Sequence, residues 1–390
     1  MGKRGQGEGN IIKRKDGLWQ TSIMYTDPIT KLKKRPTLYG KTRNEVKDKL
    51  IKMQSELQTG INISPDKIQF GDWLDRWIEN YAKSNTEKGT WQGYETNIRV
   101  HIKPLLGQLL LSKLQTDDLQ SFYNEKRTNG RIVKRKDGKN GLSENTIRLI
   151  HAPIFSALKQ AVENKMIPYN VAESVKRPKR LKRTTVPTLR SEELTQYLSE
   201  IKDDRNYAAF VLESVTGLRR SELLGLEWHH IDFKRGIINI EQTLVRTPVG
   251  EVYFKNKTKN ESSRRTLTIP DQAMPHLLAH KVMQEKERAA LEIKPERDLV
   301  FCQGDGDRIN PSTFSTHHRS LIEKSGVRKV SFHSLRHSVA TALLEADVDL
   351  KTVSEIFGHA SVIMTGDLYA DVLERMKRKA SNKLGPLIPV

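Results

Sequence analysis

The feature that most limits how this chain can fold is a regular stripe of large apolar side chains early in the sequence. The apolar positions recur every three or four residues, which is the repeat of one face of an α-helix. A face this bulky has to be buried against other helices, so we interpret its aromatic rings as core packing rather than as an exposed stacking platform. The stripe consists of Phe70, Trp73, Leu74, Trp77, Ile78 and Tyr81.

Similar patterns predict an all-helical unit over residues 66–175. Further helices are expected at about 88–103, 115–127 and 143–164, and Ser143 is placed to cap the last of them. A strongly basic loop lies between two of these helices and runs from Arg127 to Lys139. We therefore expect this unit to consist of helices joined by loops.

Residues 188–390 follow a mixed pattern. An apolar helix is predicted over residues 207–216, and Gly217 is expected to end it. Strands are predicted near 236–243, 251–255 and 264–270, with helices from there to the end. The expected fold is a mixed α/β domain that is mostly helical. Its C-terminal tail docks either on a neighbouring subunit or on its own domain.

Residues 1–62 predict a three-stranded sheet followed by one helix, which Thr42 and Glu45 begin as a capping box. Residues 1–60 carry 14 basic and six acidic side chains. A sheet with cations on its free face suits binding in a DNA groove, and a solvated basic hairpin is the alternative. The candidate contact residues are Lys13, Arg14, Lys15, Lys33 and Arg35.

The chain as a whole is strongly basic. It has 67 lysines and arginines against 47 acidic residues, a net charge of +20. Such an excess favours a polyanionic partner, most often nucleic acid. Residues 176–187 form a basic linker that either follows a phosphate backbone or acts as a nuclear-localisation signal. Its candidate DNA contacts are Lys176, Arg177, Lys179 and Arg180.

Other classes of protein fit the sequence less well. No apolar run approaches the roughly 20 residues that a membrane-spanning helix needs, and the N-terminus lacks the apolar stretch of a secretory signal. Cys302 is the only cysteine, so neither a disulfide framework nor a thiolate zinc site can form within one chain. We expect a cytoplasmic protein with no cofactor, no bound metal and no membrane partner.

Three short segments of the C-terminal domain carry candidate chemistry. The segment at 216–222 reads Thr-Gly-Leu-Arg-Arg-Ser-Glu and places Arg219 at a junction between two helices. In His-Ser-Leu-Arg-His at 333–337, His333 and Arg336 share a helical face. Gly-His-Ala-Ser at 358–361 is followed by Tyr369. Each residue alone has a more ordinary interpretation, as a surface charge or a half-buried tyrosine, so the combination indicates the site.

His333 and His337 also have the spacing of a zinc-binding pair. The metalloprotease pattern places a glutamate directly after the first histidine, where this chain has Ser334. No third ligand is evident in the sequence either. We therefore predict no metal site here.

Together these residue types fit attack on a phosphodiester. Negative charge builds up on the non-bridging oxygens, and two arginines with histidine donors can stabilise it. A tyrosine, whose free pKa is near 10, needs a base or a positive field to act as a nucleophile. A covalent intermediate would conserve the bond energy, so that strands could be resealed without metal or ATP. This agrees with a sequence that shows neither a P-loop nor an acidic metal cluster.

In these motifs, and in their order and spacing, the chain resembles the tyrosine recombinase family, specifically the integrases of phages and conjugative transposons. The resemblance implies that Tyr369 attacks the scissile phosphate and forms a 3′-phosphotyrosine. It implies that Arg219, Arg336 and His359 bind the non-bridging oxygens, and that His333 assists proton transfer.

The family also has a catalytic lysine in the β-hairpin before the second motif, where it protonates the leaving 5′-oxygen. Lys257, followed by Thr258, matches that position best. Lys255 and Lys259 are close alternatives for the same role. All three lysines are therefore candidates for this role.

Glu222 would be a supporting group that orients the site. Two positions depart from the family's pattern, since Asn256 stands where a proline is usual and Asp371 where a histidine is often found. Neither departure touches a residue that the chemistry requires.

The resemblance assigns a task to each predicted domain. Residues 1–62 resemble an arm-type DNA-binding domain, and residues 66–175 resemble a core-site-binding domain that closes a clamp on double-stranded DNA with residues 188–390. The expected assembly is a tetramer on DNA in the bacterial nucleoid, aided by a directionality factor or a host DNA-bending protein. The rival functions are a type IB topoisomerase or resolvase with the same chemistry, and a non-catalytic DNA-binding regulator.

Overall fold

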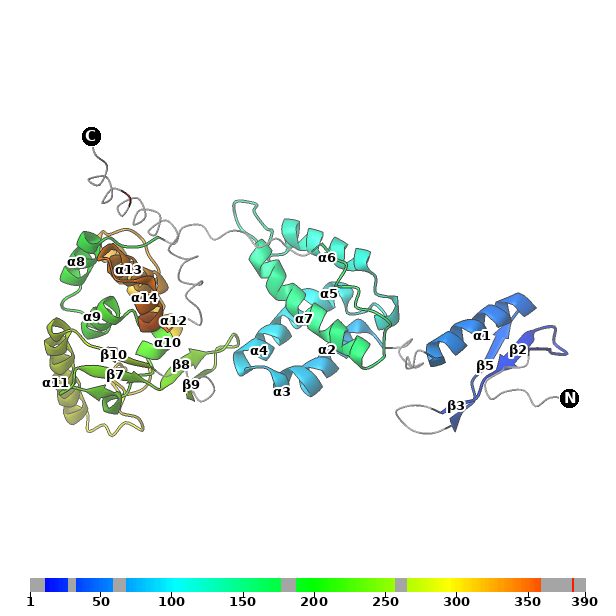
Figure 1. Ribbon diagram of the computed structural model, residues 1–390, viewed down its shortest axis with the longest axis horizontal. Coiled ribbons are helices and arrows are strands. Elements are labelled where there is room, and N and C mark those ends of the chain that lie inside the picture. Colours follow the sequence, from blue (N-terminus) through cyan, green and yellow to red (C-terminus); the bar gives the residue numbers. More distant parts are fainter. Residues whose placement is uncertain are drawn as a thin grey trace. The chain divides into compact units, whose positions relative to one another are not determined.

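The computed structural model describes residues 11–26, 33–58, 68–176, 187–256 and 265–358, together with Ser381. The chain divides into two compact units, Met1–Lys182 and Arg183–Val390. Figure 1 colours the chain from blue at the N-terminus towards red at the C-terminus.

The first unit begins with a small antiparallel sheet of three strands in the order β1-β2-β5. The helix α1 (Arg43–Gln58) packs on this sheet and buries Val46, Leu50 and Met53. The predicted sheet and helix are thus confirmed, but β3 and β4 form an additional two-stranded ribbon. The strands are β1 (Ile12–Lys13), β2 (Trp19–Ser22), β3 (Tyr25–Thr26), β4 (Lys33–Lys34) and β5 (Thr37–Gly40).

Helices make up the rest of the described part of the first unit. The predicted stripe is core packing, because Phe70, Trp73 and Trp77 are buried in the same apolar cluster. The indole nitrogen of Trp73 donates to the carbonyl oxygen of Ala157 at 2.9 Å, which ties α2 to α7. The α-helices are α2 (Phe70–Trp77), α3 (Lys83–Asn85), α4 (Lys88–Asn97), α5 (Lys103–Leu106), α6 (Thr116–Asn129) and α7 (Glu144–Glu163).

The helix predicted at 88–103 is present in the structure, but it is not α-helical throughout. After α4 the chain widens into a π-helical turn, Ile98–Ile102, before α5 begins. Pro104 lies in the first turn of α5, and proline has no N–H with which to continue the helical hydrogen-bond ladder. By contrast, the Ser143 cap forms as predicted, since its side chain accepts from the backbone N–H of Thr146.

The second unit contains two small antiparallel sheets surrounded by helices. One sheet has the order β10-β7-β6, and the other is the hairpin β8-β9. The strands are β6 (Ile231–Asp232), β7 (Ile237–Ile240), β8 (Gln242–Arg246), β9 (Val252–Asn256) and β10 (Arg265–Thr268). The helices are α8 (Ser191–Glu200), α9 (Tyr207–Thr216), α10 (Arg220–Leu223), α11 (Met274–Ala290), α12 (Pro311–Ser325), α13 (Phe332–Glu345) and α14 (Leu350–Phe357).

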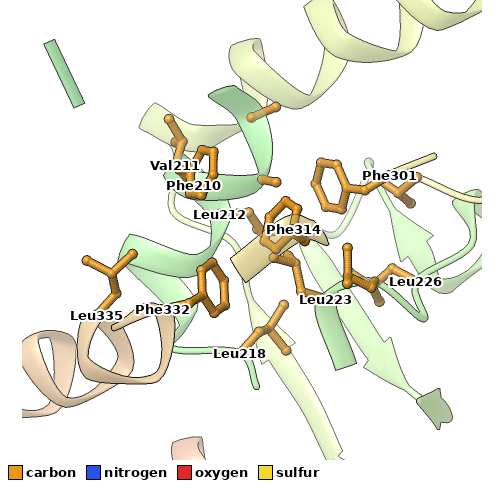
Figure 2. Close-up of a cluster of buried hydrophobic side chains, with 14 of the residues drawn as sticks. Phe210, Val211, Leu212, Leu218, Leu223, Leu226, Phe301, Phe314, Phe332 and Leu335 are labelled. Carbon is orange, nitrogen blue, oxygen red and sulfur yellow. The ribbon is translucent and has the colours of Figure 1, made fainter. Parts of the chain in front are cut away.

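Three phenylalanines pack helices α9, α12 and α13 against one another (Figure 2). Phe210 of α9 stacks on Phe314 of α12 with ring centroids 5.4 Å apart. Phe332, the first residue of α13, meets Phe314 edge to face at 5.2 Å. Burying such large rings is a strong driving force for packing, so α9, α12 and α13 are held against one another. Helix α14 packs beside α13 (Figure 1).

Among the helices of the described segments, none is both long enough and apolar enough to cross a membrane.

Candidate active site

Arg219 lies in the short connection between α9 and α10. Gly217 ends α9 in the left-handed conformation, with φ of 60°, and Arg219 then takes the extended N-cap position of α10. Two hydrogen bonds to the Glu222 carboxylate fix Arg219 in this position. The carboxylate accepts from the backbone N–H of Arg219 at 3.0 Å and from its Nη1 at 2.9 Å. The predicted helix junction is therefore confirmed, and Glu222 contacts Arg219 directly.

Glu222 is almost completely buried, at 1% exposure, and a second arginine shares it. Arg265 of β10 donates to both carboxylate oxygens, from Nη1 at 3.1 Å and from Nη2 at 2.9 Å. A buried carboxylate needs such compensation, because removing it from water without charged partners is very costly. Arg265 was not identified from the sequence. Its partner lies far away in the chain, and one arginine at a strand start gives no local signal of burial.

Arg336 projects from the first turns of α13 and is only 2% exposed. Its Nη1 donates to the carbonyl oxygen of Gly217 and its Nη2 to that of Phe357. The guanidinium also lies over the Phe357 ring, 4.4 Å from the ring centroid. Arg336 therefore joins the end of α9 to the end of α14.

The carboxyl end of α14 is where the motif residues meet. Three consecutive carbonyl oxygens accept from three different arginines. Arg265 Nε donates to Ile356 at 2.9 Å, Arg336 donates to Phe357, and Arg219 Nη2 donates to Gly358 at 2.9 Å. The last carbonyls of a helix lack intrahelical partners and carry partial negative charge, so guanidinium donors are suited to them.

The two motif glycines make this close packing possible. A Cβ on Gly217 would lie 2.7 Å from Cζ of Phe357, and one on Gly358 would lie 2.8 Å from Nη1 of Arg265. Both glycines end their helices with positive φ, 60° at Gly217 and 56° at Gly358. Glycine is thus required at both positions for conformation and for space.

His333 is exposed and shares a cavity with Arg219. The cavity has a volume of ≈ 670 Å³. The His333 ring meets that of His337 edge to face, with centroids 4.7 Å apart. In the described segments, no group of three or more potential ligands is arranged to hold a metal ion. The cavity is also lined by the basic side chains of Arg220, Arg319 and Lys329 and by the buried His318.

The structure thus brings Arg219, Glu222 and Arg336 into one network and places His333 on the cavity that Arg219 lines. Three other predicted site residues, Lys257, His359 and Tyr369, lie outside the described residues, as does Lys259. Lys255, the alternative lysine that the structure does describe, lies on β9 and pairs with β8, as does Tyr253, a tyrosine of the same hairpin.

The candidate DNA contacts of the first unit that the structure describes are all exposed, namely Lys13, Arg14, Lys15, Lys33, Arg35 and Lys176. Two of them lie over aromatic rings of the three-stranded sheet. Lys13 Nζ is 6.0 Å from the Trp19 ring centroid, and Arg14 Cζ is 5.4 Å from that of Tyr39. Arg177, Lys179 and Arg180 lie outside the described residues.

Two family models match the chain. The model of the phage integrase family covers residues 187–376. The model of the phage integrase N-terminal SAM-like domain covers residues 69–127. The first match contains all three motifs, and the second begins at the buried apolar stripe.

Individual proteins and solved structures also resemble this chain. The tyrosine recombinase XerC-like protein of Caldanaerobacter subterraneus subsp. tengcongensis is 28% identical, over 90% of this chain and 92% of its own length. Among solved structures, the Tn1549 transposon integrase bound to a circular-intermediate DNA superimposes with a TM-score of 0.65 and 20% identity, over 80% of this chain and 100% of that one. A lambda integrase tetramer bound to a Holliday junction gives a TM-score of 0.53 at 20% identity, over 90% and 96%.

The chain therefore belongs to the phage integrase family of tyrosine recombinases, as its motifs predict.

Proposed function

We propose that this protein is a site-specific DNA recombinase that integrates and excises a mobile element, with Tyr369 as its nucleophile. One observation above all supports the proposal. Arg219 and Arg336 come from distant parts of the sequence, yet they donate to adjacent carbonyls at the end of α14. The next residue in the sequence is His359, the third group proposed to bind the phosphate.

The proposed reaction exchanges one phosphodiester bond for another. The phenolic oxygen of Tyr369 forms a bond to the scissile phosphorus, the bond to the 5′-oxygen breaks, and a 3′-phosphotyrosine results. Lys257 donates a proton to the leaving 5′-oxygen, and His333 assists proton transfer. Arg219, Arg336 and His359 stabilise the charge that develops on the non-bridging oxygens. The reverse reaction reseals the strand, so the bond energy is kept and no ATP is consumed.

The proposed partner is double-stranded DNA, bound at core sites and at separate arm-type sites. The exposed cations of residues 11–26 and 33–40 support the arm-type role, because phosphate contacts by lysine and arginine provide most of the affinity for DNA. We propose a tetramer as the active assembly, as in the lambda integrase complex with a Holliday junction. A directionality factor or a host DNA-bending protein would complete the complex, which would act in the nucleoid.

A nicked suicide substrate tests the nucleophile. The short strand beyond the cleavage site diffuses away, so the covalent protein–DNA adduct accumulates. We expect the wild-type protein and Tyr253→Phe to form the adduct and Tyr369→Phe to form none. An adduct that persists in Tyr369→Phe would show that the nucleophile has been assigned wrongly.

The lysine is tested with a leaving group that needs no proton. In a substrate whose 5′-bridging oxygen is sulfur, the departing thiolate is stable without protonation. Lys257→Ala should cleave the normal substrate poorly and the sulfur substrate nearly as fast as the wild type. The matched variant Lys255→Ala should behave as wild type on both, and the opposite pattern would transfer the role to Lys255.

Recombination between two paired sites separates the proposal from its rivals. A type IB topoisomerase would relax supercoils without joining the two sites, and a non-catalytic regulator would bind without forming any adduct. Deletion of residues 1–62 should impair integration and leave cleavage of a short core site intact. If the deletion changes neither reaction, the arm-type role is wrong.

A further inference from the structure

Arg265 forms several hydrogen bonds within the candidate site but has no direct part in the proposed reaction. It begins β10, its side chain is 9% exposed, and it makes three hydrogen bonds to two different segments. Two go to Glu222 and one goes to the carbonyl oxygen of Ile356. Its Nη1 also lies only 2.8 Å from the position that a Cβ on Gly358 would take. Arg265 therefore contacts both groups that hold Arg219, namely the Glu222 carboxylate and the end of α14.

We propose that Arg265 is a positioning residue for DNA cleavage. It acts through Glu222 on the guanidinium of Arg219, and through Ile356 and Gly358 on the point from which the chain continues to His359. The inference rests on the proposed function, in which Arg219 binds the scissile phosphate. It assigns to Arg265 no contact with DNA.

The Glu222 carboxylate links Arg265 to Arg219 through both of its oxygens. Oε1 accepts from Nη1 of Arg219 at 2.9 Å and from Nη1 of Arg265 at 3.1 Å. Oε2 accepts from the backbone N–H of Arg219 at 3.0 Å and from Nη2 of Arg265 at 2.9 Å. Each oxygen that holds Arg219 is thus also held by Arg265. A rotation of the carboxylate away from Arg219 would break both bonds to Arg265.

The charges of the three side chains also support this role. Arg219 and Glu222 alone would form a neutral pair, and the nearby carboxylate would cancel much of the positive field that a phosphate requires. With Arg265 the three groups carry a net positive charge. The pair of Glu222 and Arg265 is buried, where interactions between charges are strong, so this surplus charge favours a phosphoryl transition state beside Arg219.

A matched control distinguishes positioning from ordinary structural support. Arg205 also forms a two-point ion pair in the second unit, with Glu287 at 3.1 and 2.7 Å, and donates to the carbonyl oxygen of Cys302. None of these groups belongs to the cavity or to the α14 end. Arg205→Gln therefore removes a similar set of bonds from the same unit without touching Arg219.

The first experiment needs no DNA. Amide hydrogen exchange followed by mass spectrometry reports the opening of the peptides that contain residues 217–224 and 350–358. In Arg265→Gln, these peptides should exchange about tenfold faster, because each loses charge-assisted bonds. They should be unchanged in Arg205→Gln. Wild-type exchange rates in Arg265→Gln would overturn the proposal.

The second experiment measures the chemistry. Arg265→Gln should slow adduct formation on a phosphodiester suicide substrate by about 10- to 100-fold, and Arg265→Lys should restore part of the rate because it restores the charge. On a methylphosphonate substrate, which has no negative charge for Arg219 to balance, the loss should be much smaller. In an Arg219→Ala background, Arg265→Gln should cause little further loss.

Equal losses on both substrates, or additive losses with Arg219→Ala, would mean that Arg265 only supports the fold, and the proposal would be overturned. Failure of the proposed function has a different signature. If the wild-type protein forms no adduct at all, recombination is refuted. The exchange measurement still decides whether Arg265 positions Arg219.

Discussion

Arg336 and Phe357 are joined in two ways. The guanidinium of Arg336 lies over the Phe357 ring, 4.4 Å from its centroid, and also donates to the carbonyl oxygen of the same residue. Helices α13 and α14 are thereby linked at the point where the motif residues gather. The ring is fully buried, so the contact takes place away from water, where cation–π interactions are strongest.

Phe357→Leu should therefore affect both stability and cleavage. We expect a loss of about 1–2 kcal/mol in the free energy of unfolding, from poorer packing and the lost cation–π contact. Cleavage should fall beyond what this loss explains, because Arg336 loses its support. Phe301→Leu, at another fully buried ring, is the control. Urea unfolding and adduct formation measure the two effects, and equal cleavage in both variants would contradict the expectation.

Gly217→Ala should be more harmful than the same change at another helix-ending glycine. Gly326 ends α12 with φ of 68°, and a Cβ there meets nothing within 4 Å. Gly326→Ala should cost about 1 kcal/mol for the left-handed conformation alone. Gly217→Ala adds a clash with the Phe357 ring, so we expect about 2–4 kcal/mol. Thermal and urea unfolding of the two variants would show whether the difference exists.

Burial of His318 should make the second unit sensitive to acid. Tyr197 donates to its Nδ1 at 3.1 Å, and its Nε2 donates to the carbonyl oxygen of Val330 at 3.3 Å. These bonds fix the neutral ring, and burial lowers the pKa of His318 from 6.5 to about 4. Between those values the unfolded chain binds a proton that the folded chain does not, so stability falls as pH drops from about 6.5 towards 4, by up to about 3 kcal/mol.

Urea unfolding at a series of pH values measures this slope, and His318→Phe isolates it. The variant should be less stable at pH 7.5, because Tyr197 loses its acceptor. Its stability should then change less between pH 6.5 and 4.5 than that of the wild-type protein. The same slope in both proteins would place the titration elsewhere, for example at His280, whose pKa burial also lowers.

Glu213 should destabilise the folded protein at neutral and alkaline pH. The side chain lies inside the second unit, and neither of its carboxyl oxygens has a hydrogen-bond partner among the described residues. Burial raises the pKa of Glu213 well above its usual value, although the charge of Arg336 acts in the opposite direction. Above about pH 4.5 the unfolded chain releases a proton that the folded chain retains, so stability falls as pH rises.

Glu213→Gln removes this titration while keeping the shape of the side chain. We expect the variant to be more stable than the wild-type protein at pH 8, with a smaller difference at pH 5. Chemical unfolding at the two pH values is the measurement. A less stable variant at pH 8 would instead indicate an ionised Glu213 that is paired with Arg336.

Sequence patterns predicted the helices because a helical repeat is local information, and they predicted the motif residues because three short segments occur together in one order along the chain. The stripe from Phe70 to Tyr81 has a helical repeat, and the helix-ending role of Gly217 follows from its own conformational freedom. Arg265 could not be found in this way. The importance of Arg265 depends on its hydrogen bonds to Glu222 and Ile356, which lie far from it in the chain. A strand pattern of four residues does not reveal these partners. The ribbon β3-β4 was not separated from the three-stranded sheet for a related reason, since two-residue strands are too short to show alternation of their own.

The three arginines at the end of α14 have main-chain oxygens as their acceptors, and this affects how the site tolerates mutation. A substitution at Ile356 changes the side chain and leaves the carbonyl in place, so the acceptor survives. Variation of the side chain should therefore be accepted at Ile356, whereas Phe357 and Gly358 are restricted by their own contacts with Arg336 and Arg265. Variation should be rejected at the donors, Arg219, Arg265 and Arg336. At Ile356 the main chain thus supplies the acceptor whatever side chain it carries, while the three arginines supply donors that no other residue type reproduces.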